Sequence, residues 1–237
     1  MEVRLYKLKF LTPKGFRIGG GNQDTLEPLT MGGKYVIPAS SLKGVLRRTS
    51  EIVCGHSPNH EEVDPKKVYE ENSKNEEITA IARAKGVLSV ERQKEFAELY
   101  TQYKCQIERL YGGDFFAGAI SIADVTLDGE VLERAHSSMD RKKGKVLEKH
   151  LYTEKYLNVK QFEVKVVVRG NEAQECWNKT LKFLNEVGTF LGGGKSRGIG
   201  LLALDLEESL VGEVNGLTSP PTWYKLKPYL EGKKELK

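Results

Sequence analysis

The stretch "FEVKVVVR", residues 162–169, is the clearest strand signal in this sequence, and the rest of the fold is built outward from it. Apolar residues occupy positions 162, 164, 166 and 168, and charged residues occupy 163, 165 and 169. This period of two predicts a strand with one buried face. Toward the C-terminus, residues 171–190 carry apolar side chains at helical spacing, and 202–206 alternate again around three leucines. The stretch therefore opens a strand–helix–strand unit.

The N-terminal half predicts a second unit of the same kind. Residues 2–11 alternate as a strand, and "IPASSLKGVLRR" at 37–48 predicts a helix for which Ser40 and Ser41 offer the N-cap. Strand character returns at 118–127. The order is strand, helix, insertion, strand, strand, helix, strand, which predicts a ferredoxin-like (RNA-recognition-like) α+β core.

Changes in composition divide the chain further. Residues 1–54 and 106–206 are expected to form the ferredoxin-like core, with a hairpin extension inside the polar segment 130–158. Residues 55–105 are strongly charged and show helical patterns, so they predict a mostly helical insertion. Residues 207–237 are rich in proline and lysine and are expected to form a C-terminal tail.

The overall composition favours a soluble globular protein, with 39% hydrophobic and 30% charged residues. No run of about 18 apolar residues exists, and the first residues lack the apolar region of a signal peptide, so we expect no membrane span. Three cysteines form no disulfide framework, and their odd number favours a reducing compartment, so we expect the cytoplasm. The net charge of +4 is modest, so binding to nucleic acid would depend on clustered lysine and arginine.

Two glycine-rich loops are candidates for phosphate binding. "LGGGKSRGIG" at 191–200 places five glycines around Lys195, Ser196 and Arg197, and "RIGGGNQD" at 17–24 follows the first strand. Glycine lacks the Cβ that would hold a ligand away from backbone N–H groups. The nucleotide P-loop pattern fails, because Thr189 stands where its first glycine belongs and the loop leaves a helix instead of entering one. A nucleotide-hydrolysing enzyme is therefore the weakest of the alternatives.

Four segments together carry a family resemblance: "IPASSLKGVLRR", "ERLYGG", "SSMDRKKGKVLEKHLYTEKYLNVKQFEV" and "LGGGKSRGIG". In this order they resemble the RAMP superfamily of CRISPR interference proteins, most closely the backbone (Csm/Cmr-type) subunit of type III effector complexes. The resemblance implies a modified RNA-recognition fold whose copies or paralogues stack along a CRISPR guide RNA. The implied partners are the guide RNA, the complementary target RNA and the other subunits of the complex.

The resemblance also implies which residues contact RNA. Basic residues of the first helix would bind the guide backbone without reading its sequence, and the hairpin would reach over the RNA, with Met139 as a wedge between bases. The RNA-binding residues expected on these grounds are Arg17, Gly19, Gly20, Gly21, Ser40, Ser41, Lys43, Arg47, Met139, Arg141, Gly193, Gly194, Lys195, Ser196 and Arg197. The alternative for the charged ones is an ordinary solvated surface.

The competing hypothesis is an enzyme. Relatives of this kind cut target RNA with an aspartate in the loop after the first strand and a divalent metal, which here predicts Asp24, with Glu27 second, and Mg²⁺ or another divalent cation. The sequence departs from the family pattern, because Leu26 occupies the position two residues before Pro28 where the acid usually stands. General acid–base cleavage by His136 or His150 is a further alternative.

A metal site in the insertion is the last candidate. Cys54, His56, His60 and Cys105 stand near the two ends of the insertion and could bind a structural Zn²⁺. Their spacing matches no strong zinc signature, so buried cysteines and surface histidines are the alternative.

Overall fold

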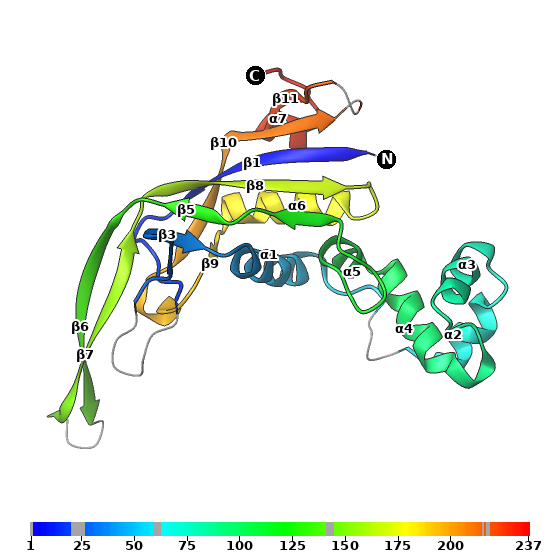
Figure 1. Ribbon diagram of the computed structural model, residues 1–237, viewed down its shortest axis with the longest axis horizontal. Coiled ribbons are helices and arrows are strands. Elements are labelled where there is room, and N and C mark those ends of the chain that lie inside the picture. The colour runs from blue at the N-terminus through cyan, green and yellow to red at the C-terminus, as the bar shows by residue number, and fades with distance from the viewer. Residues whose placement is uncertain (1, 20–26, 59–62, 141–144, 215, 217–218) are drawn as a thin grey trace.

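The computed structural model describes residues 2–19, 27–58, 63–140, 145–214, 216 and 219–237. The fold is a mixed α/β arrangement with antiparallel sheets (Figure 1). The main sheet has the strand order β11-β10-β1-β8-β4, and β9 pairs with one end of β10. Its strands are β1 (Val3–Leu11), β4 (Ile120–Ile122), β8 (Gln161–Arg169), β9 (Thr189–Phe190), β10 (Leu201–Val214) and β11 (Thr222–Lys225).

Two helices cover one face of this sheet (Figure 1): α1 (Ala39–Cys54) and α6 (Gln174–Glu186). The predicted alternation of 162–168 is confirmed, because the apolar positions of β8 are buried and oppose the buried positions of β1, as in the Phe10–Phe162 pair. Trp177 of α6 is fully buried, with its ring edge-on to Tyr6 at 5.8 Å between centroids. The strands, α1 and α6 therefore share one core.

The start of α1 differs from the sequence prediction. The N-cap position is Pro38, which makes no side-chain cap, and Ser40 and Ser41 already lie inside the first turn. The backbone N–H of Ala39 instead donates to the carboxylate of Asp124 at 2.7 Å. The predicted serine N-cap is therefore wrong, because an acid from a distant segment satisfies the first exposed N–H group.

The strand expected at 118–127 is divided between two sheets. β4 pairs with β8 in the main sheet, whereas β5 (Val125–Leu127) joins β2 (Thr30–Met31) and β3 (Lys34–Ile37) in a small sheet of order β2-β3-β5. The next two strands, β6 (Glu130–Asp140) and β7 (Lys145–Asn158), form a long hairpin that projects from the core (Figure 1). The hairpin extension expected in 130–158 is thus present.

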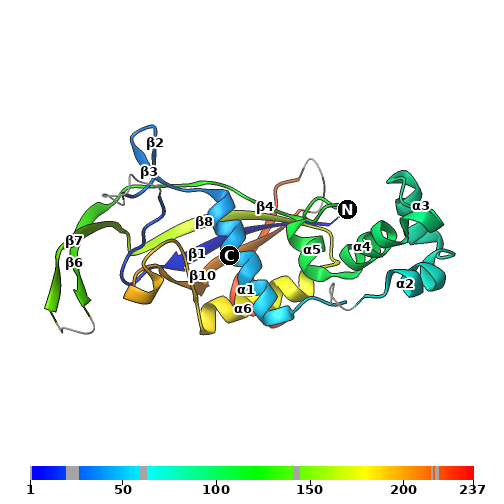
Figure 2. The ribbon, with the colours of Figure 1, turned by 90° about the horizontal axis from the view of Figure 1, so that it is seen from below.

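The helical segment projects from the opposite end of the molecule (Figure 2). It contains α2 (Pro65–Asn72), α3 (Glu76–Ala84), the short η1 (Val90–Arg92) and α4 (Gln93–Lys104), and α5 (Gln106–Tyr111) leads back to the core. A separate hydrophobic cluster, centred on Ile78, Phe96 and Leu99, holds these helices together. None of the described helices is long and apolar enough to cross a membrane.

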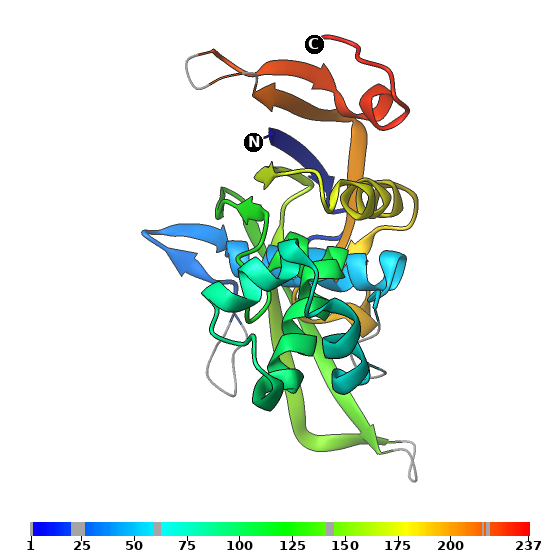
Figure 3. The same cartoon turned by 90° about the vertical axis from the view of Figure 1, so that its right-hand side faces the viewer.

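The C-terminal residues extend the main sheet. β10 continues to Val214, β11 pairs with its second half, and α7 (Leu226–Leu230) follows (Figure 3). The ammonium group of Lys7 lies 4.5 Å from the centroid of the Trp223 ring, which helps to hold β11 beside β1 and β10. Much of the expected tail is therefore regular structure.

Candidate nucleic-acid interface

A groove of about 540 Å³ lies between α1 and the segment that runs from β9 into the glycine-rich loop. From α1 it is lined by Ser40, Ser41, Gly44 and Arg48, and from the other side by Phe190 and Lys195. Two of the four motifs found in the sequence, the start of the helix and the glycine-rich loop, therefore face each other across one cavity.

The groove is positively charged. The Arg48 side chain is 75% exposed, and Lys195 is exposed. No carboxylate is found among the described residues that line the groove, whereas each of four other surface cavities of the described chain includes at least one aspartate or glutamate. Arg48 does contact Glu51 at 3.3 Å, but an exposed pair of this kind contributes little free energy. The groove therefore favours a polyanion.

Two glycines of the loop are required by close packing. An added Cβ on Gly192, whose φ is +79°, would lie 1.9 Å from the carbonyl oxygen of Arg17, and one on Gly193 would lie 2.4 Å from the Arg17 guanidinium. The Gly193 N–H group donates to that same Arg17 carbonyl at 2.9 Å. This N–H is thus used within the fold instead of facing a ligand. The loop then turns through η2 (Lys195–Arg197) and leaves Lys195 and Ser196 exposed.

A buried carboxylate holds this loop in place. Glu154 of β7 is fully buried, and its oxygens lie 3.0 Å from Nη1 of Arg17, 3.3 Å from Nε of Arg197 and 3.1 Å from Nε2 of His136. A buried charge is tolerated only when it is paired, so these contacts are needed for the fold. The hairpin, the loop after β1 and the glycine-rich loop are thereby joined at one point.

The same contacts place two predicted RNA ligands beside the buried carboxylate. Arg17 is only 9% exposed and is held by Glu154, and Arg197 is partly engaged by the same carboxylate. His136, proposed for acid–base cleavage, is a third partner of Glu154. The sequence did not reveal Glu154, because one glutamate in a basic hairpin carries no signal of burial.

The basic residues of α1 also differ from the prediction. Arg47 donates to Glu108 at 2.7 Å and to the carbonyl of Gly112 at 2.9 Å, and it contacts Glu51, so its guanidinium is already satisfied. Neither Arg47 nor the half-buried Lys43 is among the described residues that line the groove. Arg48 lines it instead, four residues after Gly44 and seven after Ser41 on the same helical face. That spacing was available in the sequence.

Of the two metal ligands predicted for cleavage, the structure describes only Glu27. Glu27 accepts from the ammonium group of Lys155 at 2.8 Å, and a Cβ added on Gly19 would lie 2.1 Å from the Glu27 carbonyl oxygen. Asp24, Gly20, Gly21 and Arg141 lie outside the described residues. Met139 lies in β6, where its backbone pairs with Val146. Within the described ranges, no group of three or more His, Cys, Asp or Glu residues is arranged to hold a metal ion.

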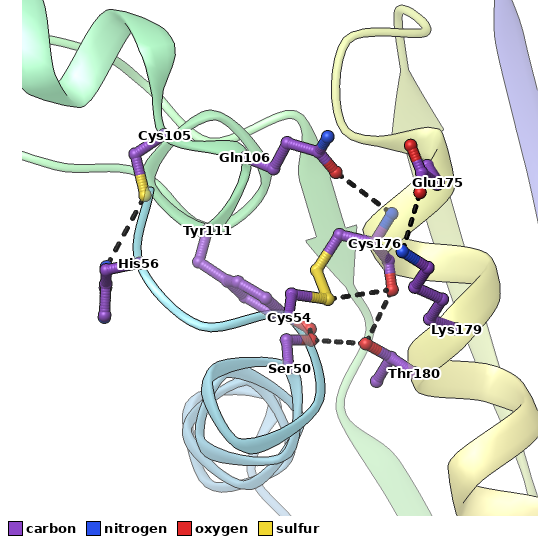
Figure 4. Close-up of a disulfide and its surroundings, with 10 residues drawn as sticks. All are labelled: Ser50, Cys54, His56, Cys105, Gln106, Tyr111, Glu175, Cys176, Lys179 and Thr180. Carbon is purple, nitrogen blue, oxygen red and sulfur yellow. Dashed lines mark hydrogen bonds and ion pairs between the residues drawn. A yellow bond between two sulfur atoms is a disulfide. The ribbon is translucent and has the colours of Figure 1, made fainter. Parts of the chain in front are cut away.

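Of the predicted zinc ligands, two lie in contact and a third is bonded to another cysteine. Cys54 is disulfide-bonded to Cys176 across 122 residues of sequence, joining the end of α1 to α6 (Figure 4). The Cys105 thiol lies 3.5 Å from Nδ1 of His56, and His60 lies outside the described residues. These side chains do not fit a four-ligand zinc site while Cys54 is bonded. The disulfide also removes the reason for placing the chain in a reducing compartment.

Comparison with known proteins agrees with the resemblance found in the sequence. The family model of the RAMP superfamily matches residues 7–203. No curated protein matches the chain. Among solved structures, a chain from a cryo-electron microscopy structure of the type III-B Cmr-beta bound to cognate target RNA is similar, with a TM-score of 0.53 and 13% identity. The similarity covers 89% of the present chain and 61% of that chain, and at this identity it shows a shared fold.

Proposed function

The chain belongs to the RAMP superfamily, and from that premise we propose that it is an RNA-binding subunit of a type III CRISPR effector complex. The observation that carries this proposal is the groove between α1 and the glycine-rich loop, whose described lining holds Arg48 and Lys195 and no carboxylate. Cations that contact phosphates give affinity for any sequence, which suits a subunit that has to accept any guide.

We further propose the backbone role, in which the subunit stacks along the guide RNA and presents the target RNA. The core supports an RNA-recognition-like assignment. β1 and β4 are parallel with β8 between them, and β8 and β10 are parallel with β1 between them. Since α1 and α6 make these two crossovers, the arrangement supports the split βαβ pair, the ferredoxin-like pattern that we propose for the core.

Binding of single-stranded RNA at several salt concentrations tests the groove directly. Fluorescence anisotropy with unrelated RNA sequences should give similar affinities, and Arg48→Ala and Lys195→Ala should each weaken binding and lower the slope of log affinity against log salt by about 1. Lys227→Ala, on α7 and outside the groove, is the control and should leave the slope unchanged. Equal slopes in all three variants would remove the groove from the proposal.

The guide-RNA assignment needs a separate experiment. The protein, isolated from its native cells at low salt, should carry short RNAs with CRISPR-repeat ends together with other subunits of the complex. Recovery of the protein alone and free of RNA would contradict the proposal.

Metal-dependent cleavage through Asp24 stays a prediction. The one described acid of the predicted pair, Glu27, is bound to Lys155. Asp24→Ala should abolish cutting of complementary RNA without changing RNA binding. Cleavage that persists in this variant would exclude Asp24 as the catalytic group.

A further inference from the structure

Phe190 is an aromatic side chain that the fold leaves uncovered. It is 39% exposed, which makes it the most exposed aromatic residue among those whose side chains the structure describes. Isolated exposed apolar residues are common on protein surfaces and need no explanation by themselves. Phe190 differs from the others because it lines the positively charged groove beside Arg48 and Lys195.

The backbone on both sides of Phe190 is anchored. Thr189 lies with its hydroxyl 3.2 Å from that of Thr49 on α1, and Leu191 is buried with its N–H donating to the carbonyl of Gly200 at 2.8 Å. β9 also pairs with β10, where Phe190 opposes Leu201. The aromatic ring is therefore presented from a fixed backbone, which lowers the entropy lost when a ligand packs on it.

The opposite wall leaves room for a planar group. Gly44 lies on the groove-lining face of α1, and a Cβ added there would meet no atom within 4 Å. Ser40 and Ser41 provide hydroxyl groups that both donate and accept hydrogen bonds, and they are not used to cap the helix. A flat apolar ring, two cations and two hydroxyls thus line one groove of about 540 Å³.

We propose that Phe190 is the stacking platform for one base of the bound RNA, with Arg48 and Lys195 holding the adjacent phosphates. This inference rests on the proposed function and specifies how its groove engages the ligand. Single-stranded nucleic acids are bound by this combination, since every base offers a π-face to an aromatic ring while cations follow the backbone. An apolar peptide would find little complementary surface between two cations, so RNA is the occupant that the lining favours.

The test compares Phe190→Ala, Phe190→Leu and Phe190→Tyr in the full chain. With a short single-stranded RNA, the Ala and Leu variants should bind about 5- to 150-fold more weakly, the range that alanine substitution gives for one stacked base. Their salt slope should equal that of the wild type, because no phosphate contact is lost. Phe190→Tyr should restore the affinity. Val187→Ala, exposed and outside the described groove lining, is the control.

A fluorescent base gives a readout that does not depend on affinity. A saturating RNA with 2-aminopurine at successive positions should be quenched at one position by the wild type and by Phe190→Tyr, and not by Phe190→Leu.

Wild-type affinity in both Phe190→Ala and Phe190→Leu, with weaker binding in Arg48→Ala, would overturn the stacking role and keep the groove. Wild-type affinity in Phe190→Leu alone would overturn stacking in favour of simple apolar contact. Unchanged binding in Arg48→Ala as well would overturn both proposals. Melting temperatures report whether each variant is folded, and the Leu variant tests the role even if the Ala variant does not fold.

Discussion

The disulfide between Cys54 and Cys176 should contribute a large part of the stability of the core. It closes a loop with a sequence separation of 122 residues. In the chain-entropy description, a cross-link of this length removes about 16 cal/mol/K from the unfolded chain, or about 5 kcal/mol at 25 °C. Measured losses for native disulfides are about 2–5 kcal/mol, so the calculated value is an upper bound. Against a typical total of about 5–15 kcal/mol, this is a large fraction.

Guanidinium unfolding with and without dithiothreitol measures this contribution. The wild type should lose about 2–5 kcal/mol of unfolding free energy on reduction, and Cys54→Ala/Cys176→Ala should show no effect of the reductant. Under denaturing conditions the untreated wild type should expose one free thiol, that of Cys105, which the structure leaves unbonded. Three free thiols in the untreated protein, or equal reductant effects in the two proteins, would refute the reasoning.

Three other perturbations have calculable outcomes. Glu154→Gln should lower the free energy of unfolding in urea by about 3–5 kcal/mol, because it leaves the buried Arg17 without a counterion. The control Glu133→Gln, whose native side chain is 60% exposed, should lower it by less than about 1 kcal/mol. Similar losses in the two variants would argue against the buried cluster. Gly198 has a φ of +79° and open space around it, so Gly198→Ala should lower the stability measured by thermal melting by about 1–2 kcal/mol. Gly192→Ala should lower it clearly more, because the added Cβ would also clash with the Arg17 carbonyl oxygen. The reverse order would be inconsistent with the loop packing. Burial raises the pKa of Tyr6 to about 12, so the neutral form is favoured in the folded state. The stability that this group contributes should be present below pH 10 and fall by about 2 kcal/mol as the pH rises to 12. Tyr6→Phe should reduce that fall, and an identical alkaline unfolding profile would contradict the argument.

Much of the core could be predicted from local periodicity. The alternation at 162–168 and the helical spacing of Trp177, Leu181 and Leu184 report burial directly, and the structure buries these positions. Periodicity works here because each pattern needs only residues a few positions apart to decide which face is apolar.

The features that the sequence did not reveal all depend on distant partners. Asp124 caps a helix that begins 85 residues earlier, and Cys54 bonds a cysteine 122 residues later. The choice between Arg47 and Arg48 depends on Glu108, which lies 61 residues away and binds Arg47. The spacing of Arg48 from Ser41 and Gly44 places these residues on one helical face, whereas the engagement of Arg47 away from the groove depends on this distant glutamate.

The contact between His56 and Cys105 has a consequence for how this chain varies. The chain leaves the core near His56 and comes back at Cys105, and the two side chains are 3.5 Å apart. The described residues between them therefore form a cassette with its own hydrophobic cluster, against which Phe115 and Phe116 also pack. Longer, shorter or unrelated cassettes could be exchanged at this point without moving α1 or the groove, because closing a longer surface loop costs little free energy. A new docking module for a partner could thus be added without rebuilding the core.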